Sequence, residues 1–203
     1  MSNKKKQIAS EIKIILLGES GVGKTNLINI LMGIPFNDNE RSNISNSYSE
    51  KKVTINNKCY KLNLWDTIGQ EKFRQLTKIF YKDSKIVIFV FDITNKVSFE
   101  ELQKYWVKDV KEQIGDEGIV KGVIANKIDL FLDEKVSTEQ GEEYANSIGA
   151  KFLSISAKTD SPKKFENFLI SLVEEFIKKK GDIVDDPNKI NLKDGGIDKK
   201  KCC

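Results

Sequence analysis

The chain has 203 residues, of which 39% are hydrophobic, enough to bury one full core but too few for two large domains. Its 34 basic and 30 acidic residues nearly balance, which argues against a nucleic-acid binder, and no apolar run is long enough to span a bilayer. With no histidine, three cysteines and no signal-peptide pattern, we expect a soluble, intracellular protein without a disulfide framework or a zinc site.

Strand and helix patterns alternate along the chain, between a polar segment at residues 1–10, expected to be disordered, and a flexible tail at residues 180–203. Residues 11–179 form one predicted α/β domain, whose mostly parallel sheet is covered by helices on both faces. The predicted strands are residues 11–17, 51–55, 59–66, 85–92, 119–126 and 151–156, the second and third forming a hairpin at Asn56-Asn57. The predicted helices are residues 24–32, 98–114, 137–147 and 161–177, and residues 33–50 form a long loop.

A glycine-rich segment follows the first predicted strand. Gly18-Glu19-Ser20-Gly21-Val22-Gly23-Lys24-Thr25 fits the phosphate-binding pattern G-x-x-x-x-G-K-[ST], with a strand before it and a helix after it. In such a loop, backbone N–H groups and the following helix N-terminus surround a polyphosphate. We expect Lys24 to reach the terminal phosphates and the Thr25 hydroxyl to bind Mg²⁺. The alternative, a plain glycine-rich turn, is disfavoured because every specified position and both flanks fit.

A second polar segment, Asp66-Thr67-Ile68-Gly69-Gln70, follows the predicted strand that ends at Asp66. At this position the Asp66 carboxylate can hold Mg²⁺ through water, and Gly69 can approach a γ-phosphate. The Gln70 amide can orient an attacking water because it both donates and accepts hydrogen bonds. By itself D-x-x-G is a common turn, so this interpretation depends on the phosphate loop.

Two further segments predict recognition of guanine. In Asn126-Lys127-Ile128-Asp129, the Asp129 carboxylate can accept hydrogen bonds from the N1–H and the 2-amine of guanine, a donor pair that adenine lacks. We expect Asn126 and the stem of Lys127 to frame the base. After the last strand, Ser156-Ala157-Lys158 places the backbone N–H of Ala157 where it can meet the guanine O6.

With these motifs in place, the chain resembles a Ras-superfamily small GTPase, and within that superfamily a Rab, over about residues 11–178. Rab-like segments include Lys61-Leu62-Asn63-Leu64-Trp65 and Lys72-Phe73-Arg74-Gln75-Leu76-Thr77. The resemblance implies a P-loop NTPase G domain: an α/β fold with a mostly parallel six-stranded sheet, one antiparallel edge strand and helices on both faces. The nucleotide-binding residues that it implies are Ser20, Gly21, Val22, Gly23, Lys24, Thr25, Asn26, Phe36, Gly69, Asn126, Lys127, Asp129, Ser156, Ala157 and Lys158.

The resemblance also implies what other residues do. Gln70 and Lys24 are the implied catalytic residues. Thr25 and Asp66 are the implied Mg²⁺ ligands, and Asp66 would bind the ion through water. Phe36 would stack edge-on against the base. The surface aromatics Tyr48, Trp65 and Phe80 correspond to a triad that effectors contact in the family.

The C-terminus resembles a doubly prenylated Rab terminus, because Cys202-Cys203 follow the basic run Lys199-Lys200-Lys201. Two lipid chains beside positive charge would give stable attachment to the cytosolic face of an endomembrane. The partners implied are an exchange factor, a GTPase-activating protein, effectors and prenyl escort proteins, around a monomeric G domain. The alternative for the two cysteines is a pair of free thiols or a local disulfide.

Two positions depart from the family pattern. Asn43 occupies the place of the switch I threonine, whose hydroxyl binds Mg²⁺ in the family, and its amide oxygen is a doubtful replacement. Ile68 stands where alanine is usual, and its β-branched side chain stiffens the turn beside Gln70. The resulting hypothesis is that nucleotide binding is intact while the GTP-ordered state of switch I is weakened.

The function expected is therefore a membrane-attached GTP/GDP switch in vesicle trafficking that hydrolyses GTP slowly. An alternative is an adaptor that holds guanine nucleotide but hydrolyses and switches poorly. A third class, a metabolic phosphotransferase that shares the phosphate loop, is disfavoured because it has no need for Asn126, Asp129 and Ala157 together.

Overall fold

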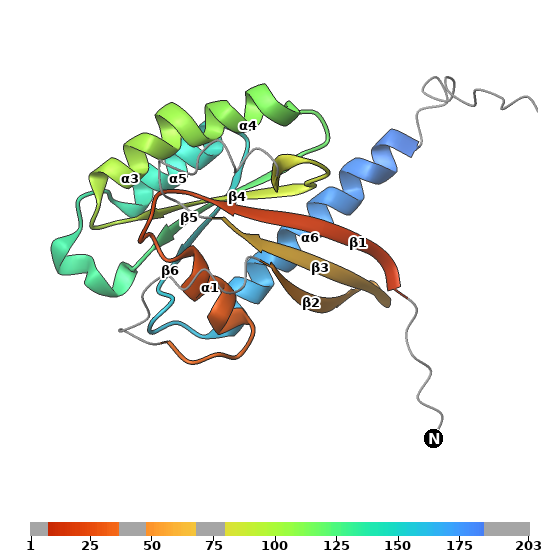
Figure 1. The fold of residues 1–203 in the computed structure, drawn as a ribbon, viewed down its shortest axis with the longest axis horizontal. Coiled ribbons are helices and arrows are strands. Elements are labelled where there is room, and N and C mark those ends of the chain that lie inside the picture. The colour runs from red at the N-terminus through yellow and green to blue at the C-terminus, as the bar shows by residue number, and fades with distance from the viewer. Residues whose placement is uncertain (1–7, 37–47, 68–79, 185–203) are drawn as a thin grey trace, which may run out of the picture.

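A computed structural model describes residues 8–36, 48–67 and 80–184 (Figure 1). One sheet of six strands runs in the order β2-β3-β1-β4-β5-β6, and every neighbouring pair is parallel except β2 and β3. The predicted mostly parallel sheet with an antiparallel edge strand is thus confirmed. The strands are β1 (Ile8–Leu17), β2 (Tyr48–Ile55), β3 (Lys58–Asp66), β4 (Ile86–Asp92), β5 (Val120–Asn126) and β6 (Lys151–Ile155).

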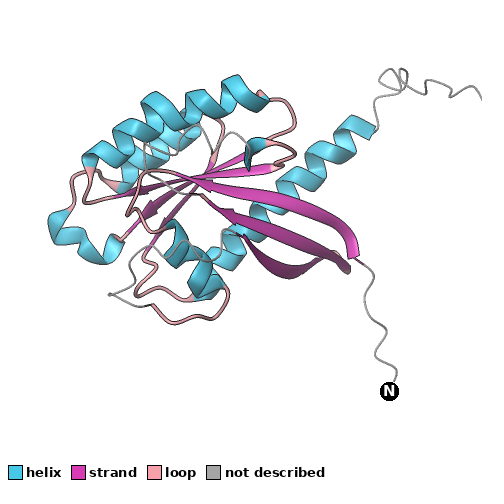
Figure 2. Cartoon of the chain, viewed as in Figure 1, coloured by secondary structure: helices cyan, strands magenta, loops and turns pink. Residues whose placement is uncertain are grey.

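Helices cover both faces of this sheet, as the alternating pattern predicts (Figure 2). One core cluster joins the sheet to α1 and α6, and the other joins it to α3, α4 and α5. The helical elements are α1 (Lys24–Leu31), α3 (Lys96–Glu101), the π-helical turn η2 (Leu102–Trp106), α4 (Val107–Ile114), the 3₁₀ helix η3 (Ile128–Asp133), α5 (Thr138–Ser147) and α6 (Pro162–Val184).

Strand β1 shows how the sequence separates the two faces. Ile12, Ile14 and Leu16 pack toward α1 and α6, whereas Ile15 and Leu17 pack toward α3, α4 and α5. All five side chains are fully buried. From Ile14 to Leu17 the strand is apolar without a break, as expected of a central parallel strand whose two faces are both covered. The carboxyl end of β1 is thereby fixed in the middle of the sheet, and the glycine-rich loop starts from it.

Two local predictions are confirmed in detail. Asn56 and Asn57 turn the β2–β3 hairpin with φ values of 48° and 62°, the left-handed conformation that a two-residue turn of this kind requires. Ser137 begins α5 with a capping box, in which its hydroxyl accepts from the Gln140 N–H and Gln140 accepts from the Ser137 N–H. Both signals are local, so they do not depend on the rest of the fold.

Several predicted boundaries are wrong. Strand β1 begins at Ile8 rather than residue 11, because β3 offers its backbone further along the edge and pairs with Ile8 and Ser10. Helix α6 continues to Val184, past the predicted tail boundary, because one helical glycine costs only about 1 kcal/mol and does not end a helix. No helix in the described ranges is long and apolar enough to cross a bilayer.

The helix predicted over residues 98–114 starts earlier and is interrupted. Asn95 caps it, its side-chain oxygen accepting from the Val97 N–H at 3.1 Å. Residues 102–106 form a π-helical turn, in which the Val107 N–H bonds to the Leu102 carbonyl five residues earlier. A periodicity of 3.6 residues cannot reveal such an inserted residue, so the sequence predicts one uniform helix.

The substitution Gly141→Ala tests the packing between α5 and the sheet. Helix propensity alone would favour alanine by about 1 kcal/mol. A methyl group at this position, however, would lie 2.8 Å from Phe91 Cζ and 2.9 Å from Phe152 Cε2. Because the Phe91 ring is fully buried and the half-buried Phe152 ring packs against the same core, both have little room to move. We therefore expect a net loss of about 1–2 kcal/mol and a lower Tm in thermal unfolding.

The matched control is Asn146→Ala, which lies on the exposed side of the same helix. It changes helix propensity without adding a contact in the core, so its Tm should hold or rise slightly. A Tm that rises for both variants would show that the sheet tolerates the extra methyl group.

Candidate functional site

The glycine-rich loop connects the carboxyl end of β1 to the start of α1, and neighbouring atoms leave no room for side chains at two of its glycines. Gly18 has a φ of 146°, and a Cβ there would lie 2.2 Å from the Val90 carbonyl oxygen. Gly23 has a φ of 96°, and a Cβ there would lie 2.2 Å from Asn126 Nδ2. The loop therefore takes a shape that only glycine permits at these positions.

Lys24 is buried, with 5% of its surface exposed, and its ammonium group donates to the carbonyls of Gly18 (2.8 Å) and Glu19 (2.9 Å). Burial lowers the pKa of Lys24 from 10.5 to about 8, against the opposing charges of Asp66 and Glu19. Because the folded pKa lies below the unfolded one, the buried charge costs stability below about pH 8, and stability recovers as the pH rises toward 10.5. Phosphate oxygens beside Lys24 would offset that cost.

Thr25 and Asp66 meet between α1 and the end of β3, where the Thr25 hydroxyl donates to Asp66 Oδ2 at 2.5 Å. The other carboxylate oxygen, Oδ1, is buried and has no hydrogen-bond partner in the part of the chain that the structure describes. Burial raises the pKa of Asp66, against the Thr25 hydrogen bond and the Lys24 charge. A buried, unpaired carboxylate oxygen beside a hydroxyl is a donor set that suits a hard cation such as Mg²⁺.

Asn126 joins the phosphate loop to the loop after β6. It is 1% exposed at the end of β5; its Nδ2 donates to the Val22 carbonyl (2.8 Å), and its Oδ1 accepts from the Ala157 N–H (3.1 Å). The sequence interpretation placed Asn126 beside the base and left the Ala157 N–H for guanine O6, and both assignments stay predictions. The two hydrogen bonds add a role that the sequence did not predict: Asn126 positions the phosphate loop against the loop after β6.

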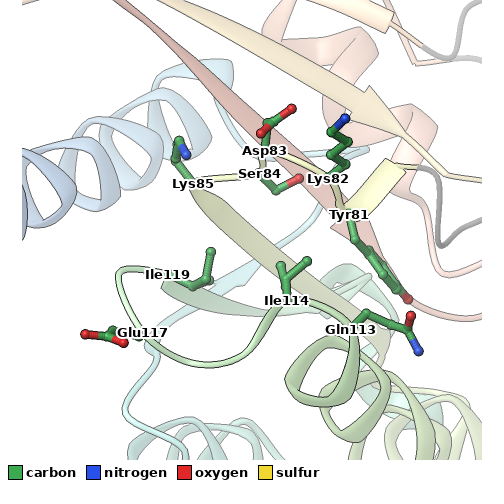
Figure 3. A pocket seen from close by; sticks show the side chains of 9 residues that line it. All are labelled: Tyr81, Lys82, Asp83, Ser84, Lys85, Gln113, Ile114, Glu117 and Ile119. Atoms are coloured by element: carbon green, nitrogen blue, oxygen red, sulfur yellow. The ribbon is translucent and has the colours of Figure 1, made fainter. Parts of the chain in front are cut away.

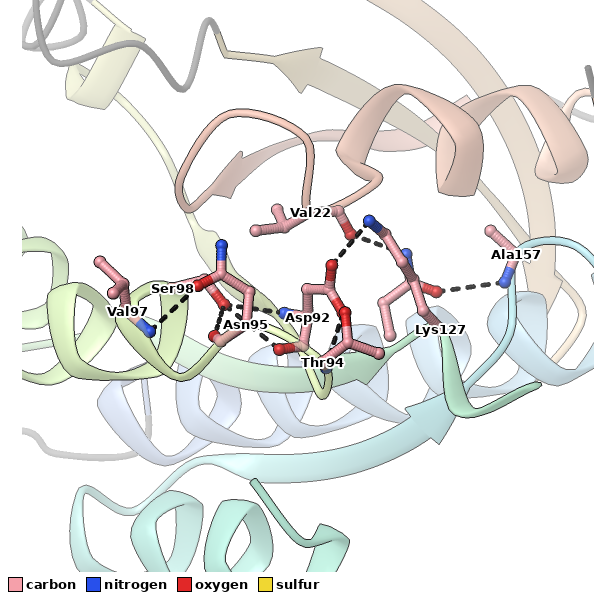
Figure 4. Close-up of polar contacts among 9 residues, drawn as sticks. Val22, Asp92, Thr94, Asn95, Val97, Ser98, Lys127 and Ala157 are labelled. Carbon is pink, nitrogen blue, oxygen red and sulfur yellow. Dashed lines mark hydrogen bonds and ion pairs between the residues drawn. The ribbon is translucent and has the colours of Figure 1, made fainter. Parts of the chain in front are cut away.

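Lys127 is fixed by a residue to which sequence reasoning assigned no function. Its ammonium group lies 2.6 Å from Asp92 Oδ2, and its φ of 67° is unusual for a residue with a side chain (Figure 4). The other oxygen of Asp92 accepts from the Thr94 N–H and hydroxyl, both at 2.8 Å. An aspartate ending the otherwise apolar run of β4 was the available signal. The ion pair holds the Lys127 stem in place.

Asp129 begins the 3₁₀ helix after Lys127, and no hydrogen bond or ion pair to another described residue occupies its half-buried carboxylate. The Ser156 segment lies opposite, with Ser156 Oγ accepting from the N–H groups of Lys158 (3.1 Å) and Thr159 (3.0 Å). Asp160, which the sequence analysis did not identify, accepts from the Ser156 N–H at 2.8 Å. These bonds fix the loop and leave the Asp129 carboxylate available to a donor pair.

Phe36 lies beside this loop, because the Lys158 ammonium group is 5.6 Å from the centroid of its ring. Two other expected residues lie on the phosphate loop and on the helix that follows it. Ser20, on the loop, is exposed, and Asn26, on α1, is half-buried. The remaining expected residues fall outside the described ranges, and these are Asn43, Ile68, Gly69, Gln70, Cys202 and Cys203.

The three aromatic residues expected at an effector surface come together at the end of the β2–β3 hairpin. The rings of Tyr48 and Trp65 are 5.2 Å apart, and those of Trp65 and Phe80 are 5.6 Å apart, both in tilted or edge arrangements. Lys13 lies 4.8 Å from the Trp65 ring.

A separate hollow of about 420 Å³ lies at the opposite edge of the sheet (Figure 3). Its lining includes Tyr81 and Lys85, which precede β4, and Ile114 and Ile119, which precede β5. Because ligands of open α/β sheets bind at the carboxyl ends of the strands, this hollow is not the candidate site.

The variant Gly23→Ala tests the contact between the phosphate loop and Asn126. The added methyl group would meet Asn126 Nδ2 at 2.2 Å and strain a backbone with φ of 96°. We expect GDP affinity to fall by about tenfold to a hundredfold in a titration with fluorescent GDP.

The matched control is Gly21→Ala, which also has a positive φ, of 79°, but has no atom within 4 Å of the added methyl group. It isolates backbone strain and should lose less affinity. Equal affinities for the two alanine variants would refute a role for the Asn126 contact.

The comparisons with known proteins agree with this geometry. The sequence profile of the Ras family matches residues 13–178. The Ras-related protein Rab-21 of Homo sapiens is 40% identical over 169 residues, covering 83% of this chain and 73% of that protein. Rab-21 of Geodia cydonium is 38% identical over 157 residues (77% and 68%), and Rab-31 of Rattus norvegicus is 40% identical over 148 residues (73% and 75%). The chain therefore belongs to the Ras family of small GTPases and, within it, to the Rab-related proteins.

Proposed function

We propose that this protein binds guanine nucleotide with Mg²⁺, hydrolyses GTP, and acts as a membrane-attached switch in vesicle trafficking. The observation that carries the proposal is the arrangement around Asn126, which joins the phosphate loop to the segments that would recognise the base. A polyphosphate site and a base site would thereby lie at the same end of the sheet, and the Asn126 side chain would set the distance between them.

The base specificity follows from Asp129. An ionised carboxylate accepts hydrogen bonds and donates none, so it suits the N1–H and 2-amine of guanine, whereas adenine presents an unprotonated N1 and no 2-amine. The Lys127 stem, held by Asp92, and the Phe36 ring, beside Lys158, would flank the base. Ala157 would offer its N–H to O6 while sharing it with Asn126.

Thr25 and Asp66 would hold Mg²⁺, Asp66 through water, since the unpaired oxygen of Asp66 is a ready acceptor for that water. The amide oxygen of Asn43 would be a third ligand. When bound, the cation neutralises charge on the β- and γ-phosphate oxygens. The Lys24 ammonium group adds positive charge there as it exchanges its loop carbonyls for phosphate oxygens.

Hydrolysis would transfer the γ-phosphoryl group to a water that Gln70 orients, while Gly69 bonds the γ-phosphate through its N–H. A slow intrinsic rate is expected, to be raised by an arginine from an activating protein. The loops that contact the γ-phosphate would relax after hydrolysis, and effectors that contact Tyr48, Trp65 and Phe80 would detect the difference.

Membrane attachment would come from prenyl groups on Cys202 and Cys203, assisted by the preceding lysines. The partners proposed are those of a Rab: an exchange factor, an activating protein, effectors and prenyl escort proteins. The G domain is proposed to be monomeric and to cycle between the cytoplasm and the cytosolic face of an endomembrane. It would extend from β1 to α6, residues 8–184, with the tail after it.

The experiment that tests the proposed specificity is Asp129→Asn, with GDP, XDP and ADP competing against fluorescent GDP. The amide can no longer accept both guanine donors, so GDP affinity should fall about a hundredfold or more. XDP affinity should rise, because xanthine carries a carbonyl at C2 that the amide can bond. Asp133→Asn, an exposed change in the same 3₁₀ helix, should leave all three affinities unchanged. Equal binding of ADP and GDP by the native protein would refute guanine specificity.

The second candidate, an adaptor that holds nucleotide without hydrolysing it, is favoured by Asn43 in the place of the family threonine. Single-turnover phosphate release from GTP-loaded protein with Mg²⁺, compared with Asn43→Thr, separates the two. For a switch, we expect both proteins to hydrolyse slowly and within about threefold of each other, since an amide oxygen can replace the hydroxyl as a metal ligand. A nearly inert native protein and an active Asn43→Thr variant would favour the adaptor instead.

A further inference from the structure

Trp106 is a large, buried side chain that carries one polar group, the indole N–H. It is 0% exposed and ends the π-helical turn between α3 and α4, which lie on one face of the sheet (Figure 1). Tyr105 packs edge-on against it, with ring centroids 5.1 Å apart. A buried indole N–H needs an acceptor, because leaving it unpaired costs about 1–3 kcal/mol.

The acceptor comes from the phosphate loop. The indole Nε1–H donates to Glu19 Oε1 at 3.0 Å, across 87 residues of sequence. π-Helical turns inside α-helices are often found at functional sites. Here the inserted residue shifts the phase of the helix at Trp106, the residue that reaches the loop.

Glu19 therefore has two contacts that bear on the nucleotide site. Its carboxylate accepts from Trp106, and its backbone carbonyl accepts from the Lys24 ammonium group at 2.9 Å. Since side chain and carbonyl belong to one residue, the helix fixes where the carbonyl stands and hence where Lys24 is held. The Trp106 contact thus connects the α3–α4 helix to the phosphate loop.

A second buried hydrogen bond on the same helix offers a comparison. Asp109, three residues after Trp106, accepts from the Tyr81 hydroxyl at 2.6 Å. Both residues are buried, and burial together with Asp109 raises the pKa of Tyr81, which keeps its hydroxyl protonated as a donor. This contact ties the helix to the segment before β4 rather than to the phosphate loop.

We propose that Trp106 is a positioning residue for nucleotide binding, acting through the Glu19 carboxylate to hold the phosphate loop in its binding shape. The inference rests on the proposed function, because it takes nucleotide to bind at this loop. Without the anchor, Glu19 and the carbonyl that holds Lys24 gain freedom, and the loop visits shapes in which it bonds the phosphates poorly. Nucleotide then dissociates faster, while its association changes little.

The test measures the dissociation rate of fluorescent GDP, with Mg²⁺ present, from the full chain and three variants. Trp106→Phe removes the N–H donor and should raise the rate about threefold to tenfold. Because this change could also loosen the core, Glu19→Ala removes the acceptor from the loop side and should raise the rate by the same factor. Glu19→Gln keeps an oxygen acceptor and should restore a rate within about twofold of the native one.

The double variant Trp106→Phe with Glu19→Ala should dissociate GDP no faster than either single variant, because both substitutions remove the same hydrogen bond. Tyr81→Phe is the control: it removes a buried hydrogen bond from the same helix, so Tm should fall while the dissociation rate is unchanged. A native rate for Glu19→Ala, or additive effects in the double variant, would overturn the proposal. Failure of the native protein to bind GDP at all would instead refute the proposed function.

Discussion

The site depends on the two hydrogen bonds of one buried amide. Asn126 donates to the Val22 carbonyl and accepts from the Ala157 N–H, so the phosphate loop, the end of β5 and the loop after β6 share one fixed point. A neutral side chain with a donor and an acceptor is the group that can do this without burying a charge. Because Gly23 lets the amide come close, the loop sequence and the Asn126 contact require each other.

Around that point the protein holds polar groups that its own structure satisfies only in part. Lys24 is charged but buried, Asp66 has an unpaired buried oxygen, and the Asp129 carboxylate has no partner among the described residues. Each of these groups lowers the stability of the free protein, and each is available to a ligand group that would satisfy it. Phosphate would satisfy Lys24, a cation Asp66, and the hydrogen-bond donors of a base Asp129. The stability missing from the free site is thus regained on binding, which ties folding stability to nucleotide.

Sequence reasoning succeeded where the signal is local. The phosphate loop, the Asn56-Asn57 turn and the Ser137 cap each depend on a few neighbouring residues, and the alternation of strands and helices predicted the sheet. It failed where the cause lies elsewhere in the chain. The pairing of Asp92 with Lys127 and of Trp106 with Glu19 joins residues far apart in sequence, and the start of β1 is set by β3.

Long-range contacts of this kind also hold the described part of the candidate site. The residues proposed to contact base and phosphate are held by Asn126, Asp92 and Glu19, whose side chains join segments far apart in the sequence. Gln70 and Asn43, which the proposed switch requires at the γ-phosphate and at Mg²⁺, lie outside the described residues. In a switch, some of the residues that contact the γ-phosphate must be able to change position. A site built from anchored residues alone would have the same conformation with GTP and GDP, and partners could not distinguish the two states.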